Sequence, residues 1–435
     1  MEALDRKKVL KSFLDHADEL DARNKEGIEK YRKDDFTLKF SRSGNKKLVL
    51  RQTGHDFYFG STAFMLGSFE VPEKETKFKE YFGHLFNQAV VPLYWKDLEP
   101  TEGHLRFSAD SEHIYRRPPV DMVLNFCKES GIEPKGHCLT WAHSNPDWLE
   151  KYTPEQRKGI LERRFRQISE AYGDKIPSFD VVNEAASNYN KGRKVLFEEF
   201  DEYALMLGEK YFAKNRKILN ETNAAIWRDF STEGKYMAFR MQLEEFVKKQ
   251  LPFDEIGLQY HIFCKPQEIA DGNRVFLDAE NMIDILDTFD AYGFPMHISE
   301  ITIPAYSGRI PENEALQAEL TEILYKTWFA TRNMKSIIWW NMVDGYAAYA
   351  PLGTEQGENQ YAGGLIHFDM TPKPAYETLD RLINREWKTN IETKADGDTF
   401  TFRGFCGTYE ATVEDESGKH TFTVHLGHDE KSAVL

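Results

Sequence analysis

The stretch IPSFDVVNE, residues 176–184, carries the pattern on which the fold of this chain depends. Its centre is apolar and rich in β-forming residues, and it closes on the polar pair Asn183 and Glu184. A short apolar run bounded by turn-forming residues indicates a buried strand, and strands buried on both faces are typical of parallel sheets. We therefore predict a parallel strand with polar side chains at its carboxyl end.

Seven further runs of this kind alternate with longer helical stretches, as expected for repeated βα units. The eight runs are FYFGST (57–62), NQAVVPLYW (87–95), EPKGHCLTW (133–141), IPSFDVVNE (176–184), KILNET (217–222), EIGLQYHI (255–262), PMHISEITI (295–303) and SIIWWNMVD (336–344). Eight strands fit a (β/α)8 TIM barrel better than an open doubly wound sheet, which more often has five to seven strands. No glycine-rich phosphate loop follows any of the runs.

The two ends of the chain have sequence patterns that differ from that of the middle. Residues 1 to about 34 predict a helix, and FTLKF and KLVLRQ around the turn RSGN predict a hairpin. After Trp387 the alternating segments DTFTFRGF, GTYEATVE and KHTFTVHL predict a small antiparallel appendage. We expect an N-terminal helix and hairpin extension (1–54), a catalytic barrel (55–385) and a β-rich appendage (386–435). The appendage is either a structural flap, which we favour, or a carbohydrate-binding module.

Composition limits the classes of partner. The 435 residues carry a net charge of -15, which repels nucleic acid and anionic membrane surfaces. The four cysteines are widely separated, and their spacing indicates neither a zinc site nor a disulfide framework. The N-terminal stretch lacks the features of a signal peptide, and no segment holds 18 uncharged apolar residues in a row. We expect a cytoplasmic protein, with secretion as the alternative if a leader has been removed; the oligomeric state stays open.

Polar and aromatic residues gather where the predicted strands end, and active sites of barrels lie at that end. They are Tyr94, Trp95, His137, Trp141, Asn183, Glu184, Asn220, Gln259, His261, Glu300, Trp340 and Asp344. A lone glutamate at a strand end is more often structural than catalytic. However, Glu184 and Glu300 close the fourth and seventh strands and should point into the same mouth. Two facing carboxyl groups are the machinery of glycoside hydrolysis, and their separation decides between retention and inversion.

Five ordered segments resemble the successive signatures of glycoside hydrolase family 10, the xylanase family. They are GHCLTWAHSNPDWL (136–149), FDVVNEA (179–185), GLQYHIF (257–263), HISEITI (297–303) and the run from WWNMVD (339–344) to KPAY (373–376). The resemblance covers roughly residues 55–385. It implies a retaining hydrolase, without metal or cofactor, that cleaves β-1,4-xylosidic linkages in xylan or xylo-oligosaccharides.

The resemblance also implies roles for individual residues. Glu184 would be the general acid/base and Glu300 the nucleophile. Asn183 and Gln259 would hydrogen-bond the sugar 2-hydroxyl and the nucleophile. The full set of expected substrate-binding residues is Asn183, Gln259, His261, Trp340, Trp141, His137, His143, Tyr94 and Trp95, with His261 supporting Glu300 and Trp340 forming the floor under the reacting sugar. His137 and His143 do not form a recognisable metal pair, because no third ligand stands at a suitable spacing.

The chain departs from the family pattern at the end of the second strand. The family's Glu-Asn-x-x-Lys, which grips the glycone sugars, is here Val90, Val91 and Tyr94. Tyr94 and Trp95 either replace the polar clamp by a stacking surface or simply pack. Both interpretations stay open.

Three further departures lie near the other signatures. Ala142 and Ala348 replace a histidine and a tryptophan of the family. Thr302 replaces the aspartate after the nucleophile, so we expect His261 to be protonated less easily. The chemistry looks retained and the specificity altered. The alternatives are a retaining β-glycosidase of the same clan acting on another sugar, and a non-catalytic carbohydrate-binding barrel.

Overall fold

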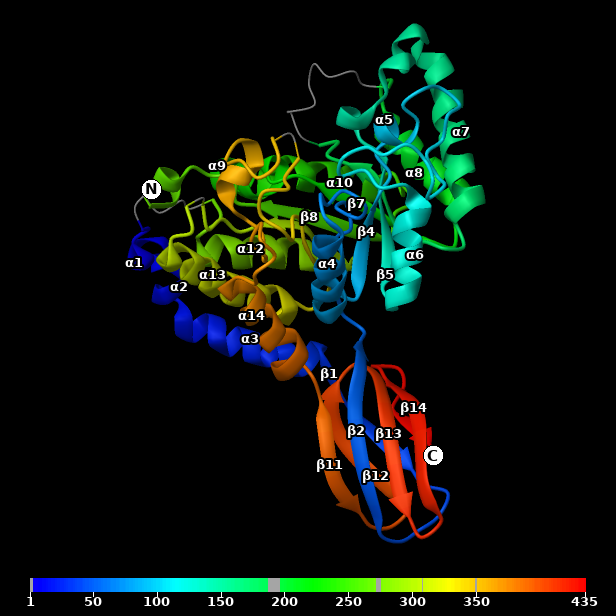
Figure 1. Ribbon diagram of the computed structural model, residues 1–435, viewed down its shortest axis with the longest axis vertical. Helices are drawn as coiled ribbons and strands as arrows, with labels where there is room; N and C mark the ends of the chain where they lie inside the picture. The colour runs from blue at the N-terminus through cyan, green and yellow to red at the C-terminus, as the bar shows by residue number, and fades with distance from the viewer. Residues whose placement is uncertain (1–2, 187–195, 271–274, 307, 349) are drawn as a thin grey trace.

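A closed barrel of eight parallel strands forms the centre of the molecule (Figure 1). The computed structural model describes residues 3–186, 196–270, 275–306, 308–348 and 350–435. The barrel strands are β3 (Tyr58–Thr62), β4 (Gln88–Pro92), β5 (Glu133–Thr140), β6 (Ser178–Asn183), β7 (Arg216–Glu221), β8 (Glu255–His261), β9 (Met296–Thr302) and β10 (Met334–Trp339), and β10 closes the ring on β3. The predicted TIM barrel is therefore confirmed, and each strand overlaps its predicted run.

Helices connect the strands around the outside of the barrel. The longer ones are α4 (Pro72–Leu85), α6 (Val120–Ser130), α7 (Pro154–Tyr172), α8 (Phe200–Tyr211), α10 (Ala238–Lys248), α12 (Ala279–Asp290), α13 (Pro311–Ala330) and α14 (Pro374–Arg381). Local sequence sets their ends. Thr153 and Gln156 form a capping box at the start of α7, and Gly131 ends α6 in the left-handed region at φ 66°. None of the helices in the described residues is long and apolar enough to span a bilayer.

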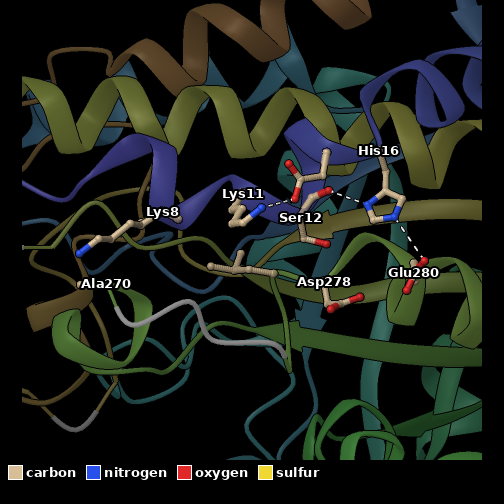
Figure 2. A pocket seen from close by; sticks show the side chains of 10 residues that line it. Lys8, Lys11, Ser12, His16, Ala270, Asp278 and Glu280 are labelled. Carbon is tan, nitrogen blue, oxygen red and sulfur yellow. Dashed lines mark hydrogen bonds and ion pairs between the residues drawn. The ribbon is translucent and has the colours of Figure 1, made fainter.

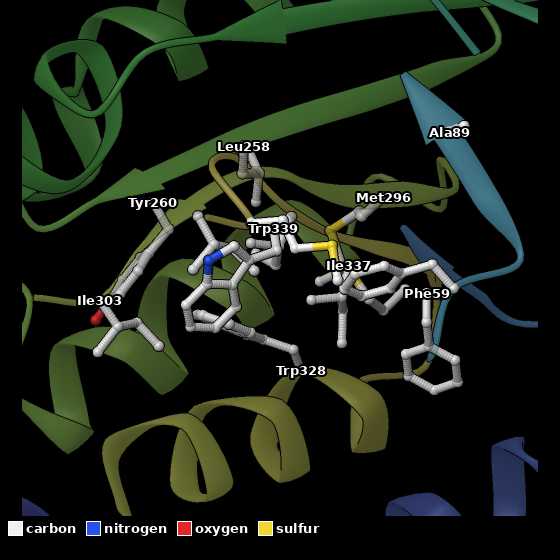
Figure 3. Close-up of a cluster of buried hydrophobic side chains, with 14 of the residues drawn as sticks. Phe59, Ala89, Leu258, Tyr260, Met296, Ile303, Trp328, Ile337 and Trp339 are labelled. Carbon is white, nitrogen blue, oxygen red and sulfur yellow. The ribbon is translucent and has the colours of Figure 1, made fainter. Parts of the chain in front are cut away.

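The main core lies between the strands and the surrounding helices (Figure 3). Along β8 the apolar residues alternate, and Leu258 and Tyr260 pack toward the helices, where the ring of Tyr260 lies 5.0 Å from that of Trp328 on α13. Gln259 and His261, which alternate with these two apolar residues, face the barrel interior and hydrogen-bond side chains of β9. Strand alternation thus separates the core from the polar mouth.

A β-bulge in β9 brings Glu300 into the barrel. Leu258 pairs with Ile298, but the next residue, Gln259, pairs with Glu300, so Ser299 is the extra residue. Before the bulge, His297 hydrogen-bonds Glu255 of β8, and after it Glu300 contacts Gln259. The bulge therefore shifts the alternation by one residue and points the glutamate at the mouth.

Both ends of the chain build one β-sandwich, which corrects the predicted hairpin. The helices α1 (Arg6–Val9), α2 (Lys11–Asp15) and α3 (Ala17–Tyr31) precede β1 (Lys33–Lys39) and β2 (Lys46–His55), and the C-terminal strands are β11 (Asn390–Ala395), β12 (Thr399–Phe405), β13 (Gly407–Asp415), β14 (Gly418–Leu426) and β15 (Ser432–Val434). The sheet orders are β12-β1-β15 and β11-β2-β13-β14. β1 and β2 therefore lie in different sheets, because the buried faces of both strands pack into the core between them.

The sandwich lies at the end of the barrel opposite Glu184 and Glu300. β2 ends at His55 and β3 begins at Tyr58, so the sandwich joins the amino ends of the barrel strands (Figure 1). The contact between the two parts is packed, since Phe405 of β12 belongs to the main core and its ring centroid lies 6.2 Å from that of Phe329 on α13.

We expect deletion of residues 388–435 to prevent correct folding. It would remove every partner of β1 and β2 and expose the buried side chains of Phe36, Leu38, Leu48 and Leu50 to water. The measurements are the soluble fraction and the thermal unfolding midpoint by circular dichroism. A soluble deletion variant with an unchanged midpoint would show that the C-terminal strands are not needed for folding.

Candidate active site

Glu184 follows directly after β6, at the mouth of the barrel. Its backbone adopts φ 57°, a left-handed conformation that is uncommon for a residue with a side chain and that clusters at functional sites. The half-buried carboxylate accepts hydrogen bonds from Trp141 Nε1 at 2.9 Å and from Gln259 Nε2 at 3.0 Å. The side chain is therefore held in one orientation.

Glu300 lies on β9 opposite Glu184 and is 4% exposed. Its Oε1 accepts hydrogen bonds from Asn220 Nδ2 and Gln259 Nε2, each at 3.1 Å, and its Oε2 lies 3.1 Å from His261 Nε2. Hydrogen bonds to a carboxylate stabilise its ionised form. Three hydrogen-bond donors thus face the Glu300 carboxylate and favour its ionised form, in opposition to the burial that raises its pKa.

A single nitrogen, Gln259 Nε2, contacts both carboxylates and so limits their separation. Because it lies 3.0 Å from Glu184 Oε1 and 3.1 Å from Glu300 Oε1, these two oxygens are at most about 6 Å apart. Retaining glycosidases place their carboxyl groups about 5 Å apart, and inverting ones leave about 6.5 Å or more for a water molecule. The separation favours retention.

Both carboxyl groups have raised pKa values, and burial is the main cause for each. Burial raises the pKa of Glu300 to about 8, the imidazole of His137 opposes this, and Glu184 adds to the increase. Burial also raises the pKa of Glu184, opposed by the hydrogen bonds from Gln259 and Trp141. Ionisation of one group therefore disfavours ionisation of the other.

His261 is neutral in this site. Burial lowers its pKa to about 4, with Glu358 and Glu184 opposing the shift. When Glu300 is ionised it can only accept a hydrogen bond, so Nε2 of His261 then carries the proton and Nδ1 accepts a hydrogen bond from the Thr302 hydroxyl at 2.9 Å. The expectation that Thr302, in place of an aspartate, leaves His261 harder to protonate stays a prediction, because burial is the main cause of the low pKa.

A buried charge network lies beneath Glu300. Asp180 on β6 contacts Lys135 Nζ at 2.5 Å and His137 Nδ1 at 2.7 Å, and His137 Nε2 lies 3.8 Å from Glu300. Burial by itself would raise the pKa of Asp180, but Lys135 and His137 lower it to about 2. The network fixes the ring of His137 next to the nucleophile.

Glu221, a buried glutamate at the end of β7, holds the backbone just after Glu184. Its Oε1 accepts a hydrogen bond from the Ala186 amide at 2.5 Å, and its Oε2 accepts one from Thr222 at 3.1 Å. Burial raises the pKa of Glu221 to about 8, and Glu184 contributes to the increase. Its carboxyl group thus ties the turn after Glu184 to the next strand.

Aromatic side chains line the mouth as expected for a sugar site. Trp340 is partly exposed, and its ring packs edge-on against His137 and His261. Trp141 is also partly exposed and stacks on His143, with ring centroids 4.9 Å apart. These rings leave exposed surface on which a sugar can pack.

The end of β4 is apolar and closely packed. Phe64, Val90, Tyr94, Cys138 and Ile338 form a buried cluster against the two tryptophans of the mouth. Tyr94 is 3% exposed, so the structure favours packing over a stacking platform for this residue.

Trp95 points into the main core, not into the mouth. It is 1% exposed, and its Nε1 donates a hydrogen bond to Glu99 at 2.8 Å. The prediction that Trp95 contacts the sugar is therefore wrong. The short helix α5 (Trp95–Leu98) begins at this residue and turns it away from the strand direction.

Sequence reasoning missed three residues of this site: Asp180, Glu221 and Lys135. Asp180 and Lys135 lie earlier in their strands than the terminal positions, and Glu221 stands one place after Asn220. The signal was a charged residue within an otherwise apolar barrel strand, which requires a buried partner. Asn183 does not contact Glu300 directly, because its Oδ1 accepts from Asn220, which donates to Glu300.

A separate cavity of about 590 Å³ lies between the N-terminal helices and the start of α12 (Figure 2). Lys8, Lys11, His16 and Glu280 line it, and His16 Nε2 lies 3.3 Å from the Glu280 carboxylate. Neither Glu184 nor Glu300 lines this cavity. Among the residues that the structure describes, no group of three or more His, Cys, Asp or Glu side chains could hold a metal ion.

We expect Thr302→Asp to raise the pKa of His261 by at least about one unit, because a carboxylate beside Nδ1 stabilises imidazolium. Titration of the His261 ring by NMR measures the change. Thr302→Val is the matched control, since it removes the hydroxyl without adding charge and should leave the pKa low. An unchanged pKa in Thr302→Asp would contradict the geometry.

We expect Asp180→Asn to lower the free energy of unfolding by about 3–5 kcal/mol, because it leaves the buried cation of Lys135 unpaired. Urea unfolding at pH 7 measures the loss. The double variant Asp180→Asn with Lys135→Met removes both charges and should lose less than the single variant. A loss below about 1 kcal/mol in Asp180→Asn would show that the pair is not coupled.

Comparison with known proteins places this site in a family. The sequence profile of glycosyl hydrolase family 10 matches residues 53–381. Endo-1,4-beta-xylanase B of Neocallimastix patriciarum is 25% identical over 62% of this chain and 29% of its own length. Anti-sigma-I factor RsgI6 of Acetivibrio thermocellus is 24% identical over 92% of this chain and 48% of its own length. The chain thus spans less than half of these two curated relatives.

Solved structures share the fold. Xylanase 10B from Thermotoga petrophila RKU-1, solved in complex with xylobiose, superposes with a TM-score of 0.59 and 20% identity, over 76% of this chain and 95% of that one. The family profile covers Glu184, Glu300 and every barrel strand. The chain belongs to glycosyl hydrolase family 10.

Proposed function

We propose that this chain is a retaining glycoside hydrolase that cleaves β-1,4-xylosidic linkages in xylan or xylo-oligosaccharides by double displacement. The observation that carries the proposal is the hydrogen-bonding of one nitrogen, Gln259 Nε2, to both carboxylates across the mouth. Two carboxyl groups this close, with one proton between them, are the starting state of the retaining reaction.

In the first step Glu300 attacks the anomeric carbon while Glu184 gives its proton to the glycosidic oxygen. The carbon–oxygen bond to the leaving sugar breaks, and a glycosyl ester forms on Glu300. Asn220, Gln259 and His261 orient the attacking carboxylate. Burial raises the pKa of Glu184, which favours the protonated acid that this step requires.

In the second step Glu184 acts as base. Esterification removes the negative charge of Glu300, so the pKa of Glu184 falls. The ionised Glu184 takes a proton from water, the oxygen of that water attacks the anomeric carbon, and Glu300 leaves as a carboxylate. Two inversions at the same carbon give net retention.

The xylan assignment is supported by the relatives, of which one is named an endo-1,4-beta-xylanase and another was solved with xylobiose. The apolar cluster at the end of β4 supports the alternative of a same-clan retaining β-glycosidase with another sugar specificity, since it replaces the polar clamp of the family. The same carboxylates would perform either reaction.

A non-catalytic carbohydrate-binding barrel is the second candidate. The relative that aligns over 92% of this chain bears the name of an anti-sigma-I factor and not of a hydrolase. Against this candidate, both glutamates and the donors around Glu300 are in place.

The proposed function predicts that the protein hydrolyses xylotetraose and releases products whose new reducing end is first the β-anomer. Proton NMR of the anomeric signals during the first minutes measures this outcome. Initial release of the α-anomer would contradict retention. Cleavage of other β-oligosaccharides without cleavage of xylotetraose would support the alternative specificity, and binding without turnover would support the non-catalytic barrel.

Substitution of each glutamate separates their roles in the same assay. Glu300→Gln should lower kcat by about a thousandfold or more on every substrate. Glu184→Ala should lose much less on a dinitrophenyl xylobioside, which needs no protonation of its leaving group, than on xylotetraose. Equal losses on both substrates would contradict the acid/base role.

A further inference from the structure

The turn that carries Glu184 is held on both sides by the end of β7. Glu184 adopts φ 57°, and a residue with a side chain stays in this conformation only where the surrounding structure holds it there. Its own amide donates to the Asn220 carbonyl oxygen at 2.9 Å. Two residues further on, the Ala186 amide donates to the Glu221 carboxylate at 2.5 Å. Two consecutive residues of β7 thus fix the backbone before and after Glu184.

The same strand end also holds the nucleophile. Asn220 Nδ2 donates to Glu300 Oε1 at 3.1 Å and to Asn183 Oδ1 at 2.7 Å. The support of the two carboxyl groups is therefore divided between neighbouring residues. The Asn220 side chain supports Glu300, whereas the Glu221 side chain supports only the turn after Glu184.

Glu221 is an unusual residue for a purely structural position. It is fully buried, and its hydrogen-bond partners among the described residues are the backbone amides of Ala186 and Thr222, not a cation. Burial of a carboxylate without a cation costs free energy, and an apolar side chain of the same length would avoid that cost. Stability of the barrel alone therefore does not explain a glutamate here. What the carboxylate adds is an acceptor for the Ala186 amide.

We propose that Glu221 is a positioning residue for the acid/base, which holds the turn 184–186 so that the Glu184 carboxyl group faces the glycosidic oxygen. This inference rests on the proposed function and deepens it. Glu221 acts through the backbone and does not contact the substrate. Without its acceptor the turn relaxes, and the Glu184 carboxyl group moves away from Trp141 and Gln259. Protonation of the leaving group is then impaired, whereas attack by Glu300 is not.

The test compares Glu221→Met with wild type on two aryl β-xylobiosides. The dinitrophenyl compound needs no protonation of its leaving group, and the phenyl compound does. We expect kcat/KM for the phenyl compound to fall about 10- to 100-fold, because a misplaced acid loses part of its contribution, and kcat/KM for the dinitrophenyl compound to change by less than about threefold. Since kcat/KM reports the steps up to the glycosyl ester, the later role of Glu184 as base does not affect the comparison.

Two variants control for a merely structural effect. Glu221→Gln keeps one acceptor oxygen for the Ala186 amide and should recover most of the loss. Glu255→Met removes a buried glutamate at the amino end of β8, so it should lower the unfolding midpoint without distinguishing the two leaving groups. An equal loss on both xylobiosides in Glu221→Met, or no loss on either, would overturn the inference while the hydrolase assignment stands.

Hydrogen exchange of the wild-type protein tests the contact without a variant and without turnover. The Ala186 amide should exchange at least about a hundredfold more slowly than an unprotected amide. Exchange at the unprotected rate overturns the inference, also where Glu221→Met does not fold. If wild type cleaves neither xylobioside, the proposed function fails, whereas slow exchange that becomes fast in Glu221→Met still supports the hold of Glu221 on this turn.

Discussion

The site depends on one hydrogen-bond donor. Gln259 Nε2 bonds to Glu184 and Glu300 together, so the position of a single amide sets the distance between the two carboxyl groups. The residues around Gln259 hold it in this position. Gln259 is 2% exposed on a central strand, and Trp227 Nε1 donates to its carbonyl oxygen at 2.6 Å, so its backbone cannot shift without disturbing the core. A preorganised donor of this kind costs no reorganisation during the reaction.

Glu300 is bordered by buried residues that cannot contact a substrate. Lys135 and Asp180 are fully buried, and their charges act on Glu300 directly as well as through the ring of His137, which Asp180 holds. Neutral His261 contributes a donor without a full charge, because burial lowers its pKa to about 4. Glu300 thus has a buried charge network on one side and a neutral donor on the other.

The barrel and the closeness of Glu184 and Glu300 at its mouth could be predicted because they rest on local patterns. Apolar runs identify buried strands, and a polar residue at the end of such a run lies at the mouth. The bulge at Ser299 could not be predicted, since strand alternation alone would place Glu300 on the opposite face from His297. The hairpin prediction was wrong for a related reason. The sequence shows that β1 and β2 are strands, but the partners that separate them lie more than 330 residues further along the chain.

Specificity is the part that local patterns determine least. A clamp formed by neighbouring residues of one strand is visible in sequence, whereas the wall made by Phe64, Val90, Tyr94, Cys138 and Ile338 is assembled from several strands and exists only in the folded barrel. Val90 and Tyr94, which stand where the family has its polar clamp, belong to this apolar cluster, and Trp141 and Trp340 pack against it. The strands that hold the catalytic pair are constrained by the core on their other face. The loops carry no such constraint, so their polar residues can be substituted without disturbing Gln259.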